Sequence, residues 1–193
     1  MKKQIAITSA VIFASSFIFA QTAKPKPPTA PATPFQFLGK TFEDCEKIVG
    51  KPLRIENPKG DERAFYRDYK ATIPGVTKIE LGREPQGAMD GPVRATVSRV
   101  TYYFPKGTAK TWKEAFVIIG LKSEGATQED LGEIKRIEAP DFPKGWIQIQ
   151  WTPSASTMTM PERYRHPNDD SLSFGGRMPT EQERQQISKP TPK

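Results

Sequence analysis

Two short segments with the same residue pattern, residues 41–50 and 111–120, constrain the fold of this chain more than any other feature. Each begins with Thr, carries an acidic residue three positions later and ends at Gly. A Thr side chain accepts a hydrogen bond from the first turn of a helix, and Gly permits the backbone turn that ends one. Both segments are therefore expected to be short helices.

The two segments also share an apolar face. Large side chains recur at helical spacing in both: Phe42, Cys45, Ile48 and Val49 in the first, Trp112, Ala115, Phe116 and Ile119 in the second. Short helices in general favour Thr, acidic residues and Gly at these positions, which could produce this likeness without duplication. We favour an internal duplication of a helix-plus-strands unit, because strand-like sequence follows both copies.

The remainder of residues 35–152 reads mainly as strands. Alternating or β-rich runs occur at residues 53–56, 64–70, 77–81, 93–104, 134–138 and 145–151. In the run 93–104 the alternation changes parity between Val97 and Val100, so a bulge or bend is expected near Ser98 and Arg99. Residues 127–131 are interpreted as one helical turn. The predicted fold class is α+β, an antiparallel sheet packed against two short helices.

The N-terminus has the features of an export signal. Lys2 and Lys3 precede an apolar stretch at residues 5–20, which is short for a transmembrane helix of about 20 residues. A signal peptide at 1–20, cleaved after Ala20, is the favoured interpretation. Ile18 stands where a small residue is preferred, so an uncleaved anchor stays open. A periplasmic or extracellular location without a stable membrane span is expected.

Polar, proline-rich sequence flanks the expected domain. Residues 21–34 hold five prolines and no large apolar side chain, and are expected to form an extended spacer. Residues 153–193 are polar and irregular and are predicted to be a disordered tail. The domain organisation expected is thus signal peptide, spacer, one domain at 35–152 and tail.

Charge argues against a nucleic-acid partner. Between residues 35 and 151 the sequence has 19 basic and 17 acidic side chains, so the net charge of +7 comes largely from the ends. Nucleic-acid binding needs concentrated Lys and Arg opposite the phosphates.

The search for catalytic, cofactor and metal residues yields none. The single histidine, His166, falls in the predicted tail, so neither a Ser-His-Asp nor a Cys-His arrangement is available inside the domain. No Cys/His cluster has zinc spacing. Cys45 lies on the apolar face of the first helix, where a buried, inert thiol is favoured over a nucleophile or an interchain disulfide.

One strand suggests a binding surface. In residues 145–151 alternation points Ile147, Ile149 and Trp151 towards the core. Trp146, Gln148 and Gln150 then share the other face. They form the candidate binding face for a protein or a sugar. The alternative is that Trp146 is covered by a helix or the tail.

The opening of the domain resembles a known family. Residues 38–41 read Leu-Gly-Lys-Thr, and residues 48–52, at the end of the helix, read Ile-Val-Gly-Lys-Pro. This pattern is similar to that of the small outer-membrane-assembly lipoproteins and their relatives with the β-lactamase-inhibitor-protein-like fold. The resemblance implies a helix before an antiparallel sheet, repeated in duplicated members, and a non-catalytic module that binds proteins through its sheet. This chain lacks the family's lipid-bearing cysteine.

These observations lead to one favoured function and one alternative. We expect an exported, non-enzymatic binding or envelope-assembly module whose partner is another envelope or extracellular protein. The alternative is a cell-wall or polysaccharide-acting enzyme, or a carbohydrate binder. An enzyme would require carboxylates that converge in a groove beside Trp146. The oligomeric state does not follow from the sequence.

Overall fold

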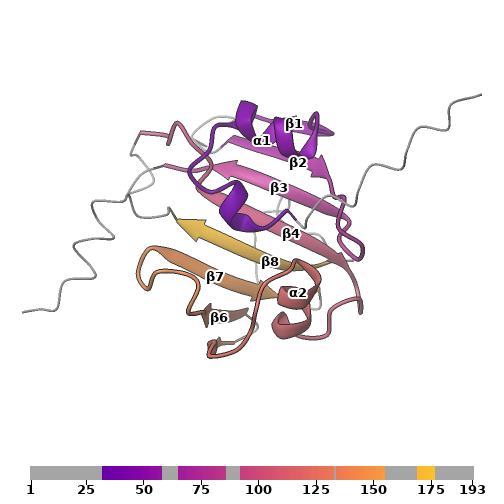
Figure 1. The fold of residues 1–193 in the computed structure, drawn as a ribbon, viewed down its shortest axis with the longest axis vertical. Coiled ribbons are helices and arrows are strands. Elements are labelled where there is room, and N and C mark those ends of the chain that lie inside the picture. The colour runs from indigo at the N-terminus through magenta and orange to yellow at the C-terminus, as the bar shows by residue number, and fades with distance from the viewer. Residues whose placement is uncertain (1–31, 58–64, 86–91, 133, 155–168, 177–193) are drawn as a thin grey trace, which may run out of the picture.

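The computed structural model of the chain describes residues 32–57, 65–85, 92–132, 134–154 and 169–176. Their centre is one eight-stranded antiparallel sheet with the strand order β1-β2-β3-β4-β8-β7-β6-β5 (Figure 1). Its strands are β1 (Arg54–Glu56), β2 (Phe65–Lys70), β3 (Lys78–Arg83), β4 (Arg99–Pro105), β5 (Thr127–Leu131), β6 (Ile134–Glu138), β7 (Ile147–Thr152) and β8 (Asp169–Gly176). The α+β class with an antiparallel sheet and two short helices is confirmed.

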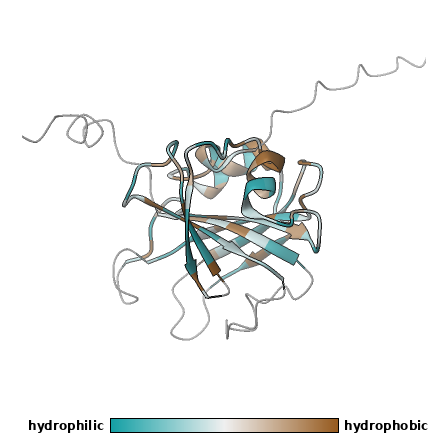
Figure 2. Cartoon of the chain, turned by 90° about the horizontal axis from the view of Figure 1, so that it is seen from below, coloured by the Kyte–Doolittle hydropathy of each residue, from teal (hydrophilic) through white to brown (hydrophobic). Residues whose placement is uncertain are grey.

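The helices lie together on one side of the sheet (Figure 2). They are α1 (Phe42–Val49), α2 (Trp112–Ile118) and a short 3-10 helix, η1 (Pro34–Gln36). The hydrophobic core fills the space between these helices and the sheet. One row of paired core residues runs through the middle strands: Leu81, Val100, Phe174, Ile149 and Ile137. All five are at most 2% exposed, so the middle of this side of the sheet is covered.

Both helices begin as the sequence predicts. The Thr41 hydroxyl accepts a hydrogen bond from the backbone N–H of Asp44, and Thr111 does the same for Glu114. The second capping box differs in one detail, because the Glu114 carboxylate accepts from the N–H of Lys110 and not from that of Thr111. The stabilisation is similar in kind, since another free N–H at the helix start gains an acceptor.

The predicted boundaries of the domain are wrong at both ends. Residues 169–176, assigned to a disordered tail, form β8 in the centre of the sheet between β4 and β7. Leu172 and Phe174 of β8 are fully buried. At the other end Ala32 lies in the core, and its carbonyl accepts a hydrogen bond from the Tyr102 hydroxyl at 2.7 Å. The described fold therefore runs from residue 32 to residue 176; the remainder of the predicted spacer and tail lies outside the described residues.

Two local predictions are wrong. Residues 127–131 form the edge strand β5 and not a helical turn, because their backbone pairs with β6 along its whole length. The strand predicted at residues 93–104 is shorter than expected, and no bulge or bend lies at Ser98 and Arg99. Strand β4 begins only at Arg99, while the backbone of Val97 exchanges hydrogen bonds with Gly39 and Lys40 before α1.

Candidate binding face

The side of the sheet opposite the helices, here called the open face, is lined by polar residues. One residue from each strand pairs with the next across the whole sheet, in the order Arg54, Asp68, Glu80, Thr101, Ser173, Gln150, Arg136 and Glu129. We call this set the polar row. Paired residues of an antiparallel sheet point to the same face, so the polar row is the counterpart of the core row behind it. Within the described residues, no helix covers it.

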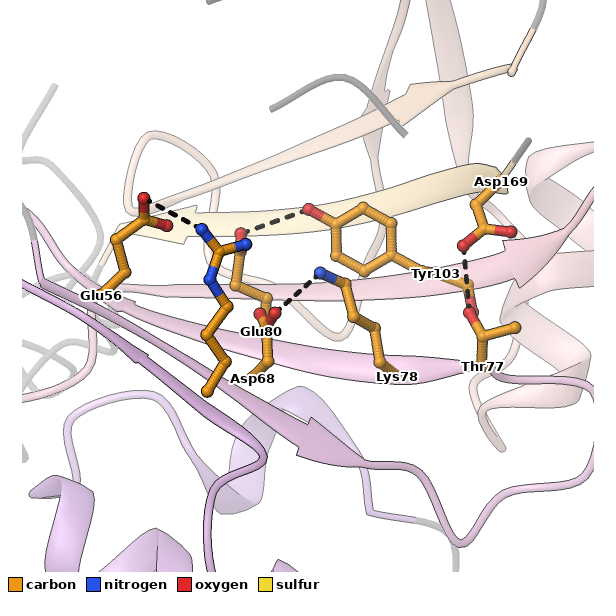
Figure 3. Close-up of polar contacts among 8 residues, drawn as sticks. Glu56, Asp68, Thr77, Lys78, Glu80, Tyr103 and Asp169 are labelled. Atoms are coloured by element: carbon orange, nitrogen blue, oxygen red, sulfur yellow. Dashed lines mark hydrogen bonds and ion pairs between the residues drawn. The ribbon is translucent and has the colours of Figure 1, made fainter. Parts of the chain in front are cut away.

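The middle of the polar row is buried and internally hydrogen-bonded. Glu80 is 7% exposed, and the Tyr103 hydroxyl donates a hydrogen bond to its carboxylate at 3.3 Å. On the next strand Asp68 forms an ion pair with Lys78 at 3.0 Å (Figure 3). Burial raises the pKa of Glu80 to about 7, and the negative charge of Asp68 acts in the same direction.

A second polar group occupies the neighbouring part of the open face. The Glu84 carboxylate accepts hydrogen bonds from Arg99 at 2.6 Å and from the Tyr66 hydroxyl at 3.1 Å. Gly82 lies beneath the Tyr66 ring, because a Cβ atom there would come within 2.7 Å of a ring carbon. These contacts link Tyr66 of β2 and Arg99 of β4 to Glu84, which directly follows β3.

The open face is accessible and hollowed at β6 and β7. Pairing between these strands stops at Ile137 and Ile149, and the strands separate beyond them. A hollow of about 610 Å³ lies at this separation. Arg136 and Gln148 line it from the open face, while Ile147 and Phe142, which belong to the core, line it from behind. A smaller hollow of about 170 Å³ adds Gln150. Cα pairing places Arg136 opposite Gln150, so their side chains lie on the same face of the sheet.

The structure divides the predicted binding residues. Gln148 and Gln150 lie on the open face beside Arg136. Trp146 precedes β7 in a turn, where its backbone N–H donates a hydrogen bond to the carbonyl of Pro143. Its partly buried side chain packs against the hydrophobic core. The alternation of residues 145–151 does not extend to Trp146, because the strand begins only at Ile147.

Sequence reasoning missed Arg136 and the Glu80 group. Alternation of residues 77–81 points Glu80 away from the core, and the structure confirms this orientation. Its burial depends on side chains of neighbouring strands, which alternation in one strand cannot show. Arg136 had a similar signal, since it stands next to the core-facing Ile137 in a strand-like run and so points to the other face. Its partner on β7 was not predictable.

The structure shows where the single cysteine lies and whether metal-ligating side chains are grouped. Cys45 is fully buried, and burial raises the pKa of its thiol to about 12. Within the described ranges, no three His, Cys, Asp or Glu side chains are grouped closely enough to hold a metal ion. His166 lies outside these ranges. None of the described helices has the length and apolar character needed to cross a bilayer.

Comparisons of the chain with protein-family models, curated proteins and solved structures found no match.

Proposed function

We propose that this chain is an exported, non-enzymatic binding or envelope-assembly module that holds another protein on the open face of its sheet. The observation that carries the proposal is the polar row. It spans all eight strands, its middle is held by internal hydrogen bonds, and Arg136 at its accessible end is 51% exposed. A surface whose side chains are already ordered loses less conformational entropy on binding than a mobile surface.

The β6–β7 part of the open face supplies the contacts in this proposal. Arg136, Gln148 and Gln150 offer guanidinium and amide groups beside two hollows, and such groups bond to backbone carbonyls and carboxylates of a partner. Arg is also enriched at protein interfaces. The partner class, another envelope or extracellular protein, follows from the proposed export.

The test is a capture experiment from envelope extract. The wild-type chain is compared with a variant carrying Arg136→Ala, Gln148→Ala and Gln150→Ala. A Glu43→Ala variant, changed at an exposed position of α1, is the matched control. We expect a specific protein to bind the wild type and the control but not the triple variant. Equal capture by all three chains, or none by the wild type, would overturn the proposal.

We further propose that the chain is a tandem of two units, each a helix followed by four strands. The element order α1-β1-β2-β3-β4 is repeated as α2-β5-β6-β7-β8. The sheet order supports this, because the halves meet at β4 and β8 and each runs outward to its own first strand. Superposition of the two halves of an experimentally determined structure is the test. Helices that cross their sheets in unrelated directions would contradict it.

The two proposals agree with the family resemblance at residues 38–52, which implies a repeated helix-and-sheet unit with a binding role. The enzyme alternative receives no such support from the larger hollow. Glycoside hydrolases use two carboxyl groups. Of the residues that line this hollow, only Glu138 carries a carboxylate, and it forms an ion pair with Lys144 at 3.0 Å.

A carbohydrate ligand is a second candidate for the same site, favoured by one observation. Arg and Gln side chains with a hollow between them suit sugar hydroxyl groups, which both donate and accept hydrogen bonds. Calorimetric titration with soluble cell-wall fragments separates the two ligands. Heat that disappears in the triple variant would favour carbohydrate, and no heat with any fragment would remove this candidate.

A further inference from the structure

Strand β1 is an edge of the sheet, and its outer side is not paired with any described strand. It stands at one end of the strand order and pairs only with β2. An edge strand exposes backbone N–H and C=O groups that can pair with another strand. The structure therefore offers a place where the sheet can be extended.

Apolar side chains border this edge and are left uncovered. Leu53 is 68% exposed and Ile55 is 56% exposed; Ile48 near the end of α1 is 40% exposed. Ile55 pairs with Arg67, whose side chain contacts Glu46 of α1, so Ile55 points to the helix side of the sheet. We call Ile48, Leu53 and Ile55 the apolar edge. They are half of the large hydrophobic side chains exposed in the described residues.

The opposite edge of the sheet is built differently. Along β5, Glu129 is ion-paired with Arg136 at 3.2 Å and Asp130 with Lys135 at 3.0 Å. Charged side chains are the usual protection of an edge strand against pairing. Strand β1 carries the charged Arg54 and Glu56 as well, but an exposed Ile stands between them at its centre. The exposed Leu131 of β5 stands at the end of that strand, so the two edges differ in where their apolar side chain lies.

The charges of β1 complement each other under a two-fold axis. Arg54 and Glu56 point to the open face, and the Arg54 guanidinium donates a hydrogen bond to the Glu56 carboxylate at 3.4 Å. In an antiparallel pair of two β1 strands centred on Ile55, Arg54 of each copy stands opposite Glu56 of the other. The two Ile55 side chains then meet on the helix side, with Leu53 and Ile48 nearby.

Other registers are disfavoured. A slip that brings Arg54 opposite Arg54, or Glu56 opposite Glu56, places like charges against each other, which is destabilising. A slip of one residue turns apolar side chains onto the polar face. Only the register centred on Ile55 satisfies both the charges and the faces.

We propose that two copies of this chain associate through β1, antiparallel and centred on Ile55, and so form one continuous sheet across a two-fold axis. The surface is separate from the β6–β7 site and does not depend on the proposed binding function. The paired strand is three residues long. Stable interfaces bury roughly 1,200–2,000 Å² in total, so this short contact gives a weak dimer that depends on concentration.

Charge reversal tests the register directly. Sedimentation velocity of the purified protein over a wide concentration range is expected to show a monomer–dimer equilibrium for the wild type. Arg54→Glu and Glu56→Arg each put like charges opposite one another and are expected to weaken the dimer about tenfold or more. A mixture of these two variants restores opposite charges at both positions, so a heterodimer is expected.

Two further variants complete the test. Ile55→Lys keeps both charges but places a cation at the centre of the edge, and is expected to abolish association. Glu129→Lys reverses a charge on the opposite edge and is expected to leave the equilibrium unchanged. Circular dichroism melts establish that each variant is folded. A wild type that stays monomeric throughout, or charge-reversed variants that associate as well as the wild type, would overturn the proposal.

Discussion

The hydroxyl of Tyr103 lies 3.3 Å from the carboxylate of Glu80, on a face of the sheet that carries no described helix. Glu80 is nevertheless 7% exposed, so an ionisable group is held almost out of water. Lys78, two residues away in the same strand, acts to lower the pKa of Glu80, but its ammonium group pairs with Asp68. Burial accordingly dominates, and the pKa of Glu80 is raised from 4.5 to about 7.

This relationship predicts that stability depends on pH between 4.5 and 7. In that window folded Glu80 keeps a proton that the unfolded chain releases, so stability falls as pH rises and is lowest above pH 7. Glu80→Gln mimics the neutral form. We expect the free energy of unfolding of the variant to exceed that of the wild type by about 2–3 kcal/mol above pH 7 and to equal it below pH 4.5. Urea unfolding at several pH values measures the difference.

The matched control is Glu129→Gln, which alters an exposed carboxylate of the same polar row. Its unfolding free energy should follow the wild-type pH profile. A Glu80→Gln variant whose advantage is the same at every pH would show that Glu80 ionises normally in the folded protein.

Tyr69→Phe is predicted to be neutral or stabilising. The hydroxyl oxygen of Tyr69 is the one buried side-chain polar atom among the described residues without a partner in hydrogen-bond geometry. Burial raises the pKa of Tyr69 to about 12 and outweighs the nearby Arg67, which acts to lower this pKa. Removing the hydroxyl relieves a desolvation penalty while the ring stays in the core, for a gain of up to about 1 kcal/mol. Thermal unfolding measures the change. Tyr102→Phe is the contrasting control, because it breaks the bond to Ala32 and should destabilise. Destabilisation by both variants alike would contradict the assignment.

Truncation before β8 is predicted to prevent folding. A chain ending at residue 154 loses Leu172 and Phe174 and leaves β4 and β7 without their shared neighbour. Loss of even one large core side chain costs about 2–5 kcal/mol, which is a large part of a typical domain's stability. Circular dichroism and proteolysis of the truncated chain provide the measurement. A chain ending at residue 176 is the control and should unfold cooperatively; a folded product ending at 154 would contradict the central position of β8.

The Cys45 thiol is predicted to be unreactive in the folded protein. It is fully buried, and its pKa of about 12 leaves almost no thiolate at neutral pH. Alkylation by iodoacetamide should therefore proceed only at the rate of unfolding, and should become fast in denaturant. Mass spectrometry over time measures the rate. Rapid modification without denaturant would mean that α1 opens readily or that the thiol is accessible.

The helices were predictable because their signals are local. Thr41 and Thr111 cap the helix N–H groups within one turn, and these hydrogen bonds need no distant partner. The strands with several alternating apolar residues were found for the same reason. Strand β8 was missed because its two large apolar residues, Leu172 and Phe174, stand in an otherwise polar segment. Its strand conformation is stabilised by pairing with β4 and β7, which its own residues do not indicate.

Sequence patterns alone predict the α+β class, the positions of the two helices and which side chains of most strands face the core, with Glu80 facing away from it. These features depend on hydrogen bonds and periodicities within a few residues of one another. Four features become visible only in the folded chain: the central place of β8, the polar row, the separation of Trp146 from Gln148 and Gln150, and the exposed edge at Ile55. Each of these depends on which strands become neighbours, and strand neighbours are chosen by packing between segments far apart in the chain.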